Sequence, residues 1–302
     1  MHKETPKYLI TYKKGEFTSR NKKLWQLLEQ CSLCPWSCGV NRLENDSGQC
    51  GIGKKARVSS FMTHYGEEKP ISGQYGSGTI FFSGCNLNCQ FCQNWEISQK
   101  LIGHEVNDQD LAEMMLTLQH QGCHNINLVS PTHVVPQIIS ALMLAIPAGL
   151  SIPIVYNSGG YDAIHTLRLL DGIIDIYMPD MKYADDIIAE KYSGIKSYSS
   201  INRAAVREMH LQVGDLKINA QGIAFQGLLV RHLVLPNELA GTKNIAEFLA
   251  REISTETYIN IMDQYRPEFQ APKHPKINRR ISIEENQKAI AEARLVGLHR
   301  FD

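Results

Sequence analysis

Short apolar segments alternate with longer amphipathic segments along most of this chain. Six of the short segments are rich in Val, Ile, Leu, Phe and Tyr, and polar residues follow each one, a pattern typical of buried strands. The predicted strands cover residues 79–82, 125–129, 152–156, 173–178, 227–235 and 258–262.

Apolar residues at helical spacing separate these strands. Asp108 is a suitable N-cap for a helix that Gly122 ends. Similar patterns predict helices over 134–145, 161–170, 245–253 and, after Ser282 as a cap, 283–296. Strands joined by crossover helices are parallel and bind ligands at their carboxyl ends. Six such units predict an α/β fold with a partial barrel rather than a closed eight-stranded one.

Length and charge are those of a large soluble domain. The 302 residues contain 31 Lys and Arg against 31 Asp and Glu, so nothing in the net charge attracts nucleic acid or an anionic membrane. The longest apolar runs, such as 138–146, are too short to cross a bilayer, and the chain does not begin like a signal peptide. We therefore expect a cytoplasmic protein without a membrane or nucleic-acid partner.

Three cysteines follow the first predicted strand. Cys85, Cys89 and Cys92 have C-x3-C-x2-C spacing, and the aromatic Phe91 precedes the last of them. Three thiolates can bind three irons of a four-iron cluster and leave the fourth iron open to a ligand that is not protein. Clustered cysteines in an intracellular chain bind metal more often than they form disulfides, and zinc usually takes four ligands in paired spacings. The spacing therefore favours an open iron–sulfur cluster.

A second group of cysteines lies nearer the N-terminus. Its members are Cys31, Cys34, Cys38 and Cys50, and nearby glycines permit the tight turns that a metal knot needs. A structural zinc site and an auxiliary iron–sulfur cluster for electron entry or substrate contact both fit four thiolates, and free thiols are the third alternative. The remaining cysteine, Cys123, is expected to be a packed thiol.

From about residue 72 to 265 the chain resembles the pyruvate formate-lyase activating-enzyme branch of the radical S-adenosylmethionine (SAM) superfamily. It is most similar to the activating-enzyme-like iron–sulfur proteins of that branch. The resemblance implies a partial (βα)6 radical SAM barrel over 72–265, an N-terminal cysteine-rich metal-binding extension over 1–71, and a C-terminal loop and helix packing on the barrel over 266–302. The matching segments are 76–82, the cysteine loop with Gln93 and Asn94, 156–160, 179–182 and 231–236.

The resemblance also implies which residues contact SAM. The segment after the second strand, often Gly-Gly-Glu in the family, reads Ser130-Pro131-Thr132 here, so the Thr132 hydroxyl and nearby carbonyls would accept hydrogen bonds from the SAM ammonium. Asp180 and Lys182 match the family's Asp-x-Lys, in which the lysine pairs with the SAM carboxylate. The expected cofactor contacts are Phe91, Ser130, Thr132, Asn157, Ser158, Asp180, Lys182 and His232, with Arg231 as a neighbouring candidate.

The resemblance implies a radical SAM enzyme, an activating-enzyme-like oxidoreductase. An electron donor such as flavodoxin or ferredoxin would reduce a [4Fe-4S] cluster, and SAM would be cleaved to methionine and a 5′-deoxyadenosyl radical that abstracts hydrogen from a substrate. By analogy with activating enzymes the substrate is a protein glycine, and the alternatives are a small molecule, an RNA or a peptide. No catalytic side chain is assigned. A non-catalytic metal-binding interaction module is the alternative of a different class; the altered 130–132 segment favours it and the intact cysteine loop opposes it.

Overall fold

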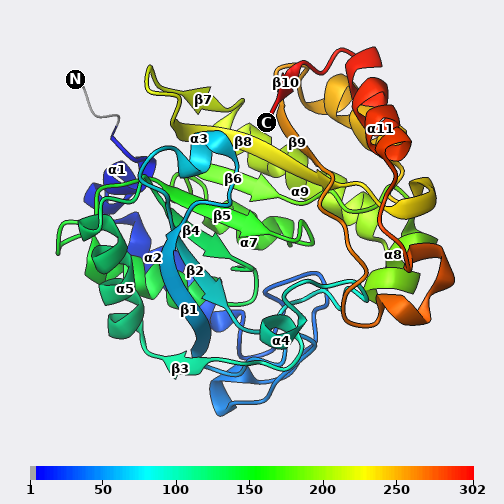
Figure 1. Cartoon of the computed structure of the whole chain (residues 1–302). Helices are drawn as coiled ribbons and strands as arrows, with labels where there is room; N and C mark the ends of the chain where they lie inside the picture. Colours follow the sequence, from blue (N-terminus) through cyan, green and yellow to red (C-terminus); the bar gives the residue numbers. More distant parts are fainter. Residues whose placement is uncertain (1–4) are drawn as a thin grey trace.

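The computed structural model describes residues 5–302, which form one mostly parallel sheet with helices on its faces (Figure 1). The sheet order is β10-β9-β8-β6-β5-β4-β2-β1-β3, with β7 paired to β8. All neighbours from β2 to β9 run parallel. The six predicted strands are confirmed, with ends shifted by up to three residues: β2 (Ser77–Phe82), β4 (Ile126–Val129), β5 (Ile154–Ser158), β6 (Ile176–Pro179), β8 (Ala224–Leu233) and β9 (Tyr258–Met262).

Four further strands extend this sheet. β1 (Ala56–His64) pairs antiparallel with β2 and with β3 (His104–Val106). At the other edge, β10 (Arg300–Phe301) pairs parallel with β9, and β7 (Lys217–Ile218) pairs antiparallel with β8. None of these strands was predicted. Because β1 and β10 belong to the segments 1–71 and 266–302, all three predicted segments contribute to one sheet, and the domain boundaries stay a prediction.

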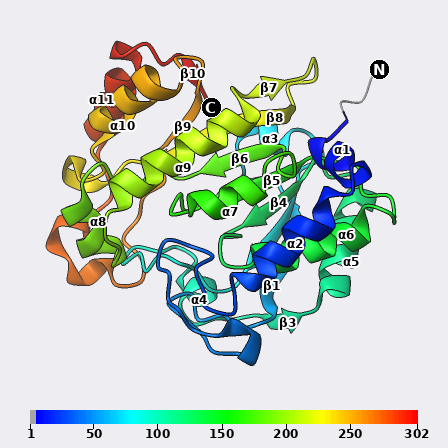
Figure 2. The ribbon, with the colours of Figure 1, turned by 180° about the vertical axis from the view of Figure 1, so that it is seen from behind.

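Helices connect the parallel strands and cover the outer face of the sheet, as the view from behind shows for α2, α6, α7 and α9 (Figure 2). Helix α5 is capped by Asn107 and Asp110 in a capping box rather than by Asp108, whereas Ser282 caps α11 as predicted. The bounds are α1 (Lys7–Lys13), α2 (Glu16–Gln26), α3 (Lys69–Ser72), α4 (Trp95–Ser98), α5 (Asp108–His120), α6 (Val135–Ala145), α7 (Ile164–Leu169), α8 (Asp186–Ser193), α9 (Tyr198–Val213), α10 (Thr242–Phe248) and α11 (Ile283–Leu295).

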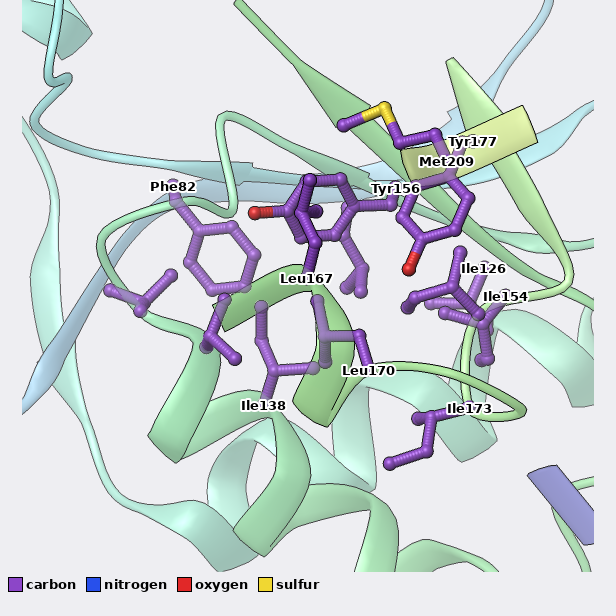
Figure 3. Packing of buried hydrophobic residues seen from close by; sticks show 14 of the residues in the cluster. Phe82, Ile126, Ile138, Ile154, Tyr156, Leu167, Leu170, Ile173, Tyr177 and Met209 are labelled. Carbon is purple, nitrogen blue, oxygen red and sulfur yellow. The ribbon is translucent and has the colours of Figure 1, made fainter. Parts of the chain in front are cut away.

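The main core lies between the sheet and its outer helices. Ile126 and Tyr156 of the strands pack there with Ile138 of α6, Leu167 of α7 and Met209 of α9 (Figure 3). Because side chains alternate along a strand, the residues between these positions face the other side of the sheet. That inner face includes an apolar cluster with Val155 and Leu229, and near the carboxyl ends of the strands it carries polar and charged side chains beside apolar ones. The outer core thus fixes a scaffold whose inner face can hold a ligand.

The segment after β9 packs against the cysteine loop. The Tyr265 ring lies edge-on to Phe91, with 5.6 Å between ring centroids, and Phe269 stacks on Trp95 at 5.3 Å. The backbone N–H of Gln270 donates to the Gln90 carbonyl at 2.8 Å. The C-terminal region therefore covers one side of the loop that carries Cys85, Cys89 and Cys92. Within the described residues, no helix combines the length and the apolar character needed to cross a bilayer.

Candidate functional site

A cavity of about 240 Å³ lies at the carboxyl ends of the parallel strands. The loop after β2 contributes all three of its cysteines, the end of β5 contributes Asn157 and Ser158, and the segments after β4 and β6 contribute further polar residues. Six of the eight expected cofactor contacts line this cavity, whereas Thr132 and His232 do not. The residues that line the cavity include Cys85, Leu87, Cys89, Phe91, Cys92, Ser98, Val129, Ser130, Asn157, Ser158, Asp180, Lys182, Arg231, Leu233 and Met262.

Each sulfur of the cysteine loop lies beside a hydrogen-bond donor. Leu87 N–H donates to Cys85 Sγ at 3.4 Å, and the Ser193 hydroxyl donates to Cys89 Sγ at 3.0 Å. The Ser98 hydroxyl lies 3.2 Å from Cys92 Sγ. Donors at these positions suit thiolates, which are the form that binds iron.

Burial raises the pKa of the Cys85 thiol to about 12 and that of Cys89 to about 11, and in both cases the nearby Lys182 ammonium opposes the shift. A bound metal would lower the pKa of both thiols, because a thiol that coordinates a metal loses its proton. Within residues 5–302, no three His, Cys, Asp or Glu side chains are arranged so that they could hold a metal ion, so the ligand set stays a prediction. The shared cavity, the donors and the lysine nevertheless fit a cluster bound by three thiolates.

A buried ionic network lines the same cavity as the cysteines. The Asp180 carboxylate accepts from Lys182 Nζ at 2.5 Å and from Arg231 Nε at 2.9 Å, and Arg231 also donates to Asn157 Oδ1 at 2.6 Å. Burial raises the pKa of Asp180, but Arg231 and Lys182 together outweigh burial and hold it below its usual value. Asp180 is therefore ionised and pairs with both cations, while Glu67, whose Oε2 lies 3.9 Å from Arg231 Nη1, balances the charge of Arg231 from another side. The Lys182 ammonium lines the cavity and is the cation that can pair with an anionic group there.

A second buried carboxylate ties the ends of β4 and β5 together. Asp162 accepts hydrogen bonds from the hydroxyls of Thr132 at 2.7 Å, Tyr156 at 2.9 Å and Ser158 at 2.7 Å. The Thr132 hydroxyl thus donates its proton to Asp162, and Thr132 does not line the cavity, so its predicted contact with SAM stays a prediction. The cavity is lined by Ser130 instead, whose backbone has φ +58°. Sequence reasoning missed Asp162, and only its position just after Gly160 and the β5 loop could have drawn attention to it.

His232 is enclosed on the far side of β8. Its Nδ1 lies 2.7 Å from the Met181 carbonyl and its Nε2 2.8 Å from the Thr242 hydroxyl, which fits a neutral ring that donates at Nδ1 and accepts at Nε2. His232 therefore does not line the cavity, and its predicted contact with the cofactor stays a prediction. Neighbouring residues of a strand point to opposite faces of the sheet. Arg231 therefore points into the cavity, and His232 is buried on the opposite face of β8.

Two buried imidazoles make the protein sensitive to mild acid. Burial lowers the pKa of His232 and of His133 to about 4, below the value of about 6.5 in an unfolded chain. Between these values the unfolded state binds more protons, so the free energy of unfolding falls as the pH drops from about 6.5 to 4, by about 3 kcal/mol per imidazole. Urea titrations of the native chain and His232→Gln should give a shallower pH dependence in the variant. The exposed His299→Gln is the control, and equal slopes for His232→Gln and the native chain would contradict the prediction.

The four N-terminal cysteines also lie close together. Cys31, Cys34 and Cys50 are buried, and burial raises the pKa of Cys34 to about 12, with the other three thiols adding to the shift. A Cβ atom at Gly48 would lie 2.6 Å from Cys38 Sγ, so only glycine permits this approach. Because no three His, Cys, Asp or Glu side chains of residues 5–302 are placed to hold a metal ion, a metal at these four cysteines stays a prediction, and their arrangement does not distinguish zinc from iron.

The two cysteine segments are in direct contact. A Cβ atom at Gly84 (φ +82°) would lie 2.5 Å from the Cys50 carbonyl, and Gly84 directly precedes Cys85. Trp36 Nε1 donates to the Asn86 carbonyl at 2.7 Å. The backbone of Cys50 therefore packs against the residue that begins the cysteine loop.

Helix α7 supports the N-terminal cysteine segment from the side of the sheet. The Thr166 hydroxyl donates to the Leu33 carbonyl at 2.7 Å, and His165 Nε2 lies 2.8 Å from the Ser32 carbonyl. Both carbonyls belong to residues next to metal-ligand candidates, so α7 helps to fix the conformation of the segment.

Comparison with known proteins agrees with this site. The family model described as the radical SAM superfamily matches residues 79–249. An uncharacterized protein from Methanocaldococcus jannaschii is 34% identical over 281 residues, which cover 90% of this chain and 76% of the relative. The structure of a radical SAM methyltransferase from Sphaerobacter thermophilus superposes with a TM-score of 0.52 at 13% identity, covering 74% of this chain and 66% of that one, which shows a shared fold. Because the family model covers more than half of its residues, this chain belongs to the radical SAM superfamily.

Proposed function

We propose that this protein cleaves SAM reductively with a [4Fe-4S] cluster held by Cys85, Cys89 and Cys92. The observation that carries the proposal is that these three cysteines share one cavity with the charged pair Asp180 and Lys182 at the carboxyl ends of the strands. When bound, such a cluster supplies the electron that splits the sulfonium into methionine and a 5′-deoxyadenosyl radical.

The residues of the cavity would bind and orient SAM. Lys182, which is held by Asp180, has ammonium hydrogens left to pair with the SAM carboxylate. Asn157 accepts from Arg231 through Oδ1, so its amide N–H groups are the donors that it can offer to the ligand. The backbone at Ser130 would accept from the SAM ammonium. Apolar side chains would exclude water from the reacting atoms, namely Leu87, Phe91, Val129, Leu233 and Met262.

We assign the protein, as a finer proposal, to the activating-enzyme-like branch with a partial (βα)6 barrel. The support is the similarity over 76–82, 156–160, 179–182 and 231–236 and the six neighbouring parallel strands, whose sheet ends in edge strands rather than closing on itself. In this proposal the enzyme acts in the cytoplasm, flavodoxin or ferredoxin supplies the electron, and the radical abstracts hydrogen from a protein glycine. A small molecule, an RNA or a peptide is the alternative substrate.

The four N-terminal cysteines are proposed to bind a second metal. The contact between Cys50 and Gly84 supports an auxiliary iron–sulfur cluster through which electrons reach the first one, because the two cysteine segments lie next to each other. A zinc ion with a structural role is the alternative, since the same packing would also stabilise the cysteine loop. Iron, sulfide and zinc analysis of the reconstituted protein distinguishes the two.

Anaerobic reconstitution followed by a SAM-cleavage assay tests the proposed function. We expect the loaded native chain to form 5′-deoxyadenosine from SAM with dithionite as the reductant, without added substrate. The controls omit dithionite or the protein. A chain that carries a full complement of iron and sulfide at the first site and still fails to cleave SAM would overturn the proposal in favour of the non-catalytic metal-binding module.

A further inference from the structure

Ser193 connects the end of α8 to the middle cysteine of the loop. Its hydroxyl lies 3.0 Å from Cys89 Sγ and 2.7 Å from the Tyr183 hydroxyl. All three side chains are at least nine-tenths buried, with exposed fractions of 0% for Ser193, 1% for Tyr183 and 8% for Cys89. Water therefore competes little for these hydrogen bonds, and their strength is set by the protein.

The backbone holds this contact in place on both sides of Cys89. Asn88 N–H donates to the Ser193 carbonyl at 3.0 Å, and Gln90 N–H donates to the Tyr192 carbonyl at 2.8 Å. The C-terminal end of α8 and the cysteine loop are thus fixed in register, although the two segments are about a hundred residues apart in sequence. The hydroxyl cannot leave the sulfur without breaking these backbone bonds or changing its rotamer.

Two hydroxyl groups and one sulfur atom form a chain of hydrogen bonds that runs in one direction, from Tyr183 through Ser193 to Cys89. A serine hydroxyl has one proton, so when Ser193 donates to sulfur it can only accept from Tyr183. Tyr183 then donates its phenolic proton to Ser193. Because neighbouring hydrogen bonds polarise one another, the tyrosine makes the serine a better donor to sulfur.

A hydrogen bond to a cluster thiolate favours the reduced state. Reduction adds negative charge to the cluster and its sulfurs, and a fixed donor interacts more strongly with the more negative state. Cys85 receives its bond from a backbone N–H that no side-chain substitution removes, whereas Cys89 depends on the Ser193 side chain. Ser193 is thus a donor to the first site that a conservative substitution can delete.

We propose that Ser193, oriented by Tyr183, is a positioning residue that donates a hydrogen bond to the Cys89 thiolate and raises the reduction potential of the cluster. The inference rests on the proposed function in one respect, namely that Cys89 is a cluster ligand. It concerns the electron-accepting step and is independent of which substrate the radical attacks.

A potentiometric titration followed by EPR of the reduced cluster tests this role. The full chain and Ser193→Ala are reconstituted anaerobically to equal iron and sulfide content, and the signal of the first cluster is identified as the one that SAM changes. At the native midpoint potential, we expect the ratio of reduced to oxidised cluster to fall about tenfold in Ser193→Ala, which corresponds to ~59 mV for a one-electron couple.

Tyr183→Phe separates the role of the tyrosine from that of the serine. Alone it should shift the potential in the same direction by a smaller amount, because Ser193 still donates. Combined with Ser193→Ala it should add nothing, since Tyr183 acts on the sulfur through Ser193. Ser200→Ala is the matched control, because that exposed hydroxyl donates only within its own helix region, to the Ser197 carbonyl at 3.1 Å.

Either of two results would overturn the proposal. One is an unchanged midpoint in a fully loaded Ser193→Ala variant. The other is an equal shift from Tyr183→Phe with and without the Ser193 hydroxyl. If Ser193→Ala takes up no cluster, the proposal is tested with Tyr183→Phe alone. An unchanged midpoint potential in Tyr183→Phe would then overturn the proposal. If the native chain fails to cleave SAM, the proposed function is refuted. The difference in midpoint potential between the native chain and Ser193→Ala can still be measured.

Discussion

Replacing Cys85, Cys89 and Cys92 together by Ala is expected to reduce 5′-deoxyadenosine formation to the level seen without protein. The three thiolates are the only proposed ligands of the cluster that supplies the electron, and they are the only cysteines among the described residues that line the cavity. The measurement is product formation from SAM and dithionite after anaerobic reconstitution, together with iron, sulfide and zinc content. Metal that remains in the variant belongs to the N-terminal cysteines.

Cys123→Ala is the matched control for this triple variant. Cys123 is buried in the outer core, where its sulfur lies 3.2 Å from the Thr63 hydroxyl, and it belongs to neither cysteine group. We expect this variant to keep its iron content and its SAM cleavage. Cleavage by the triple variant at a rate comparable to that of the control would contradict the assignment of the cluster ligands.

Arg231→Ala is expected to lower the free energy of unfolding by about 3–5 kcal/mol, because it leaves buried partners without their cation. Asp180 would keep only Lys182, Asn157 would lose the donor to Oδ1, and Glu67, whose Oε2 lies 3.9 Å from Arg231 Nη1, would lose its nearby positive charge. Urea unfolding followed by circular dichroism measures the difference. Arg231→Lys should lie between the native chain and Arg231→Ala, because lysine restores the charge without the planar fork.

A surface arginine provides the comparison for Arg231. Arg168 lies 3.4 Å from Glu208, and its side chain is 70% exposed. Removing an arginine that is this exposed typically costs less than about 1 kcal/mol. If Arg168→Ala and Arg231→Ala lower the free energy of unfolding by similar amounts, the prediction that the buried network around Asp180 contributes strongly to stability is wrong.

The parallel strands were predictable because their signal is local. Strands such as 154–158 are buried on both sides, so the hydrophobicity of their apolar residues identifies them. The edge strands β3 and β10 have two or three residues each and exist because a neighbour pairs with them, which sequence pattern does not reveal. Helix α9 was missed although it is long, since its buried face includes polar or small residues such as Asn202 and Ala205.

The site was predictable as far as strand ends and cysteine spacing determine it. Residues that follow parallel strands meet at one edge, which is why Ser130, Asn157 and Lys182 were found together. The choice between Arg231 and His232 required the register of β8. Asp162 and Ser193 act through tertiary hydrogen bonds to other residues, so neither belongs to a recognisable motif.

The support that α7 gives to the N-terminal cysteines has a consequence for the order of synthesis. The carbonyls of Ser32 and Leu33 are held by His165 and Thr166, which the ribosome adds more than a hundred residues later. At translation rates of about 5–20 residues per second, this interval is on the order of 10 s. During that time the four thiols lack their packing partners and are open to oxidation, so anaerobic expression protects the nascent chain before any metal is bound.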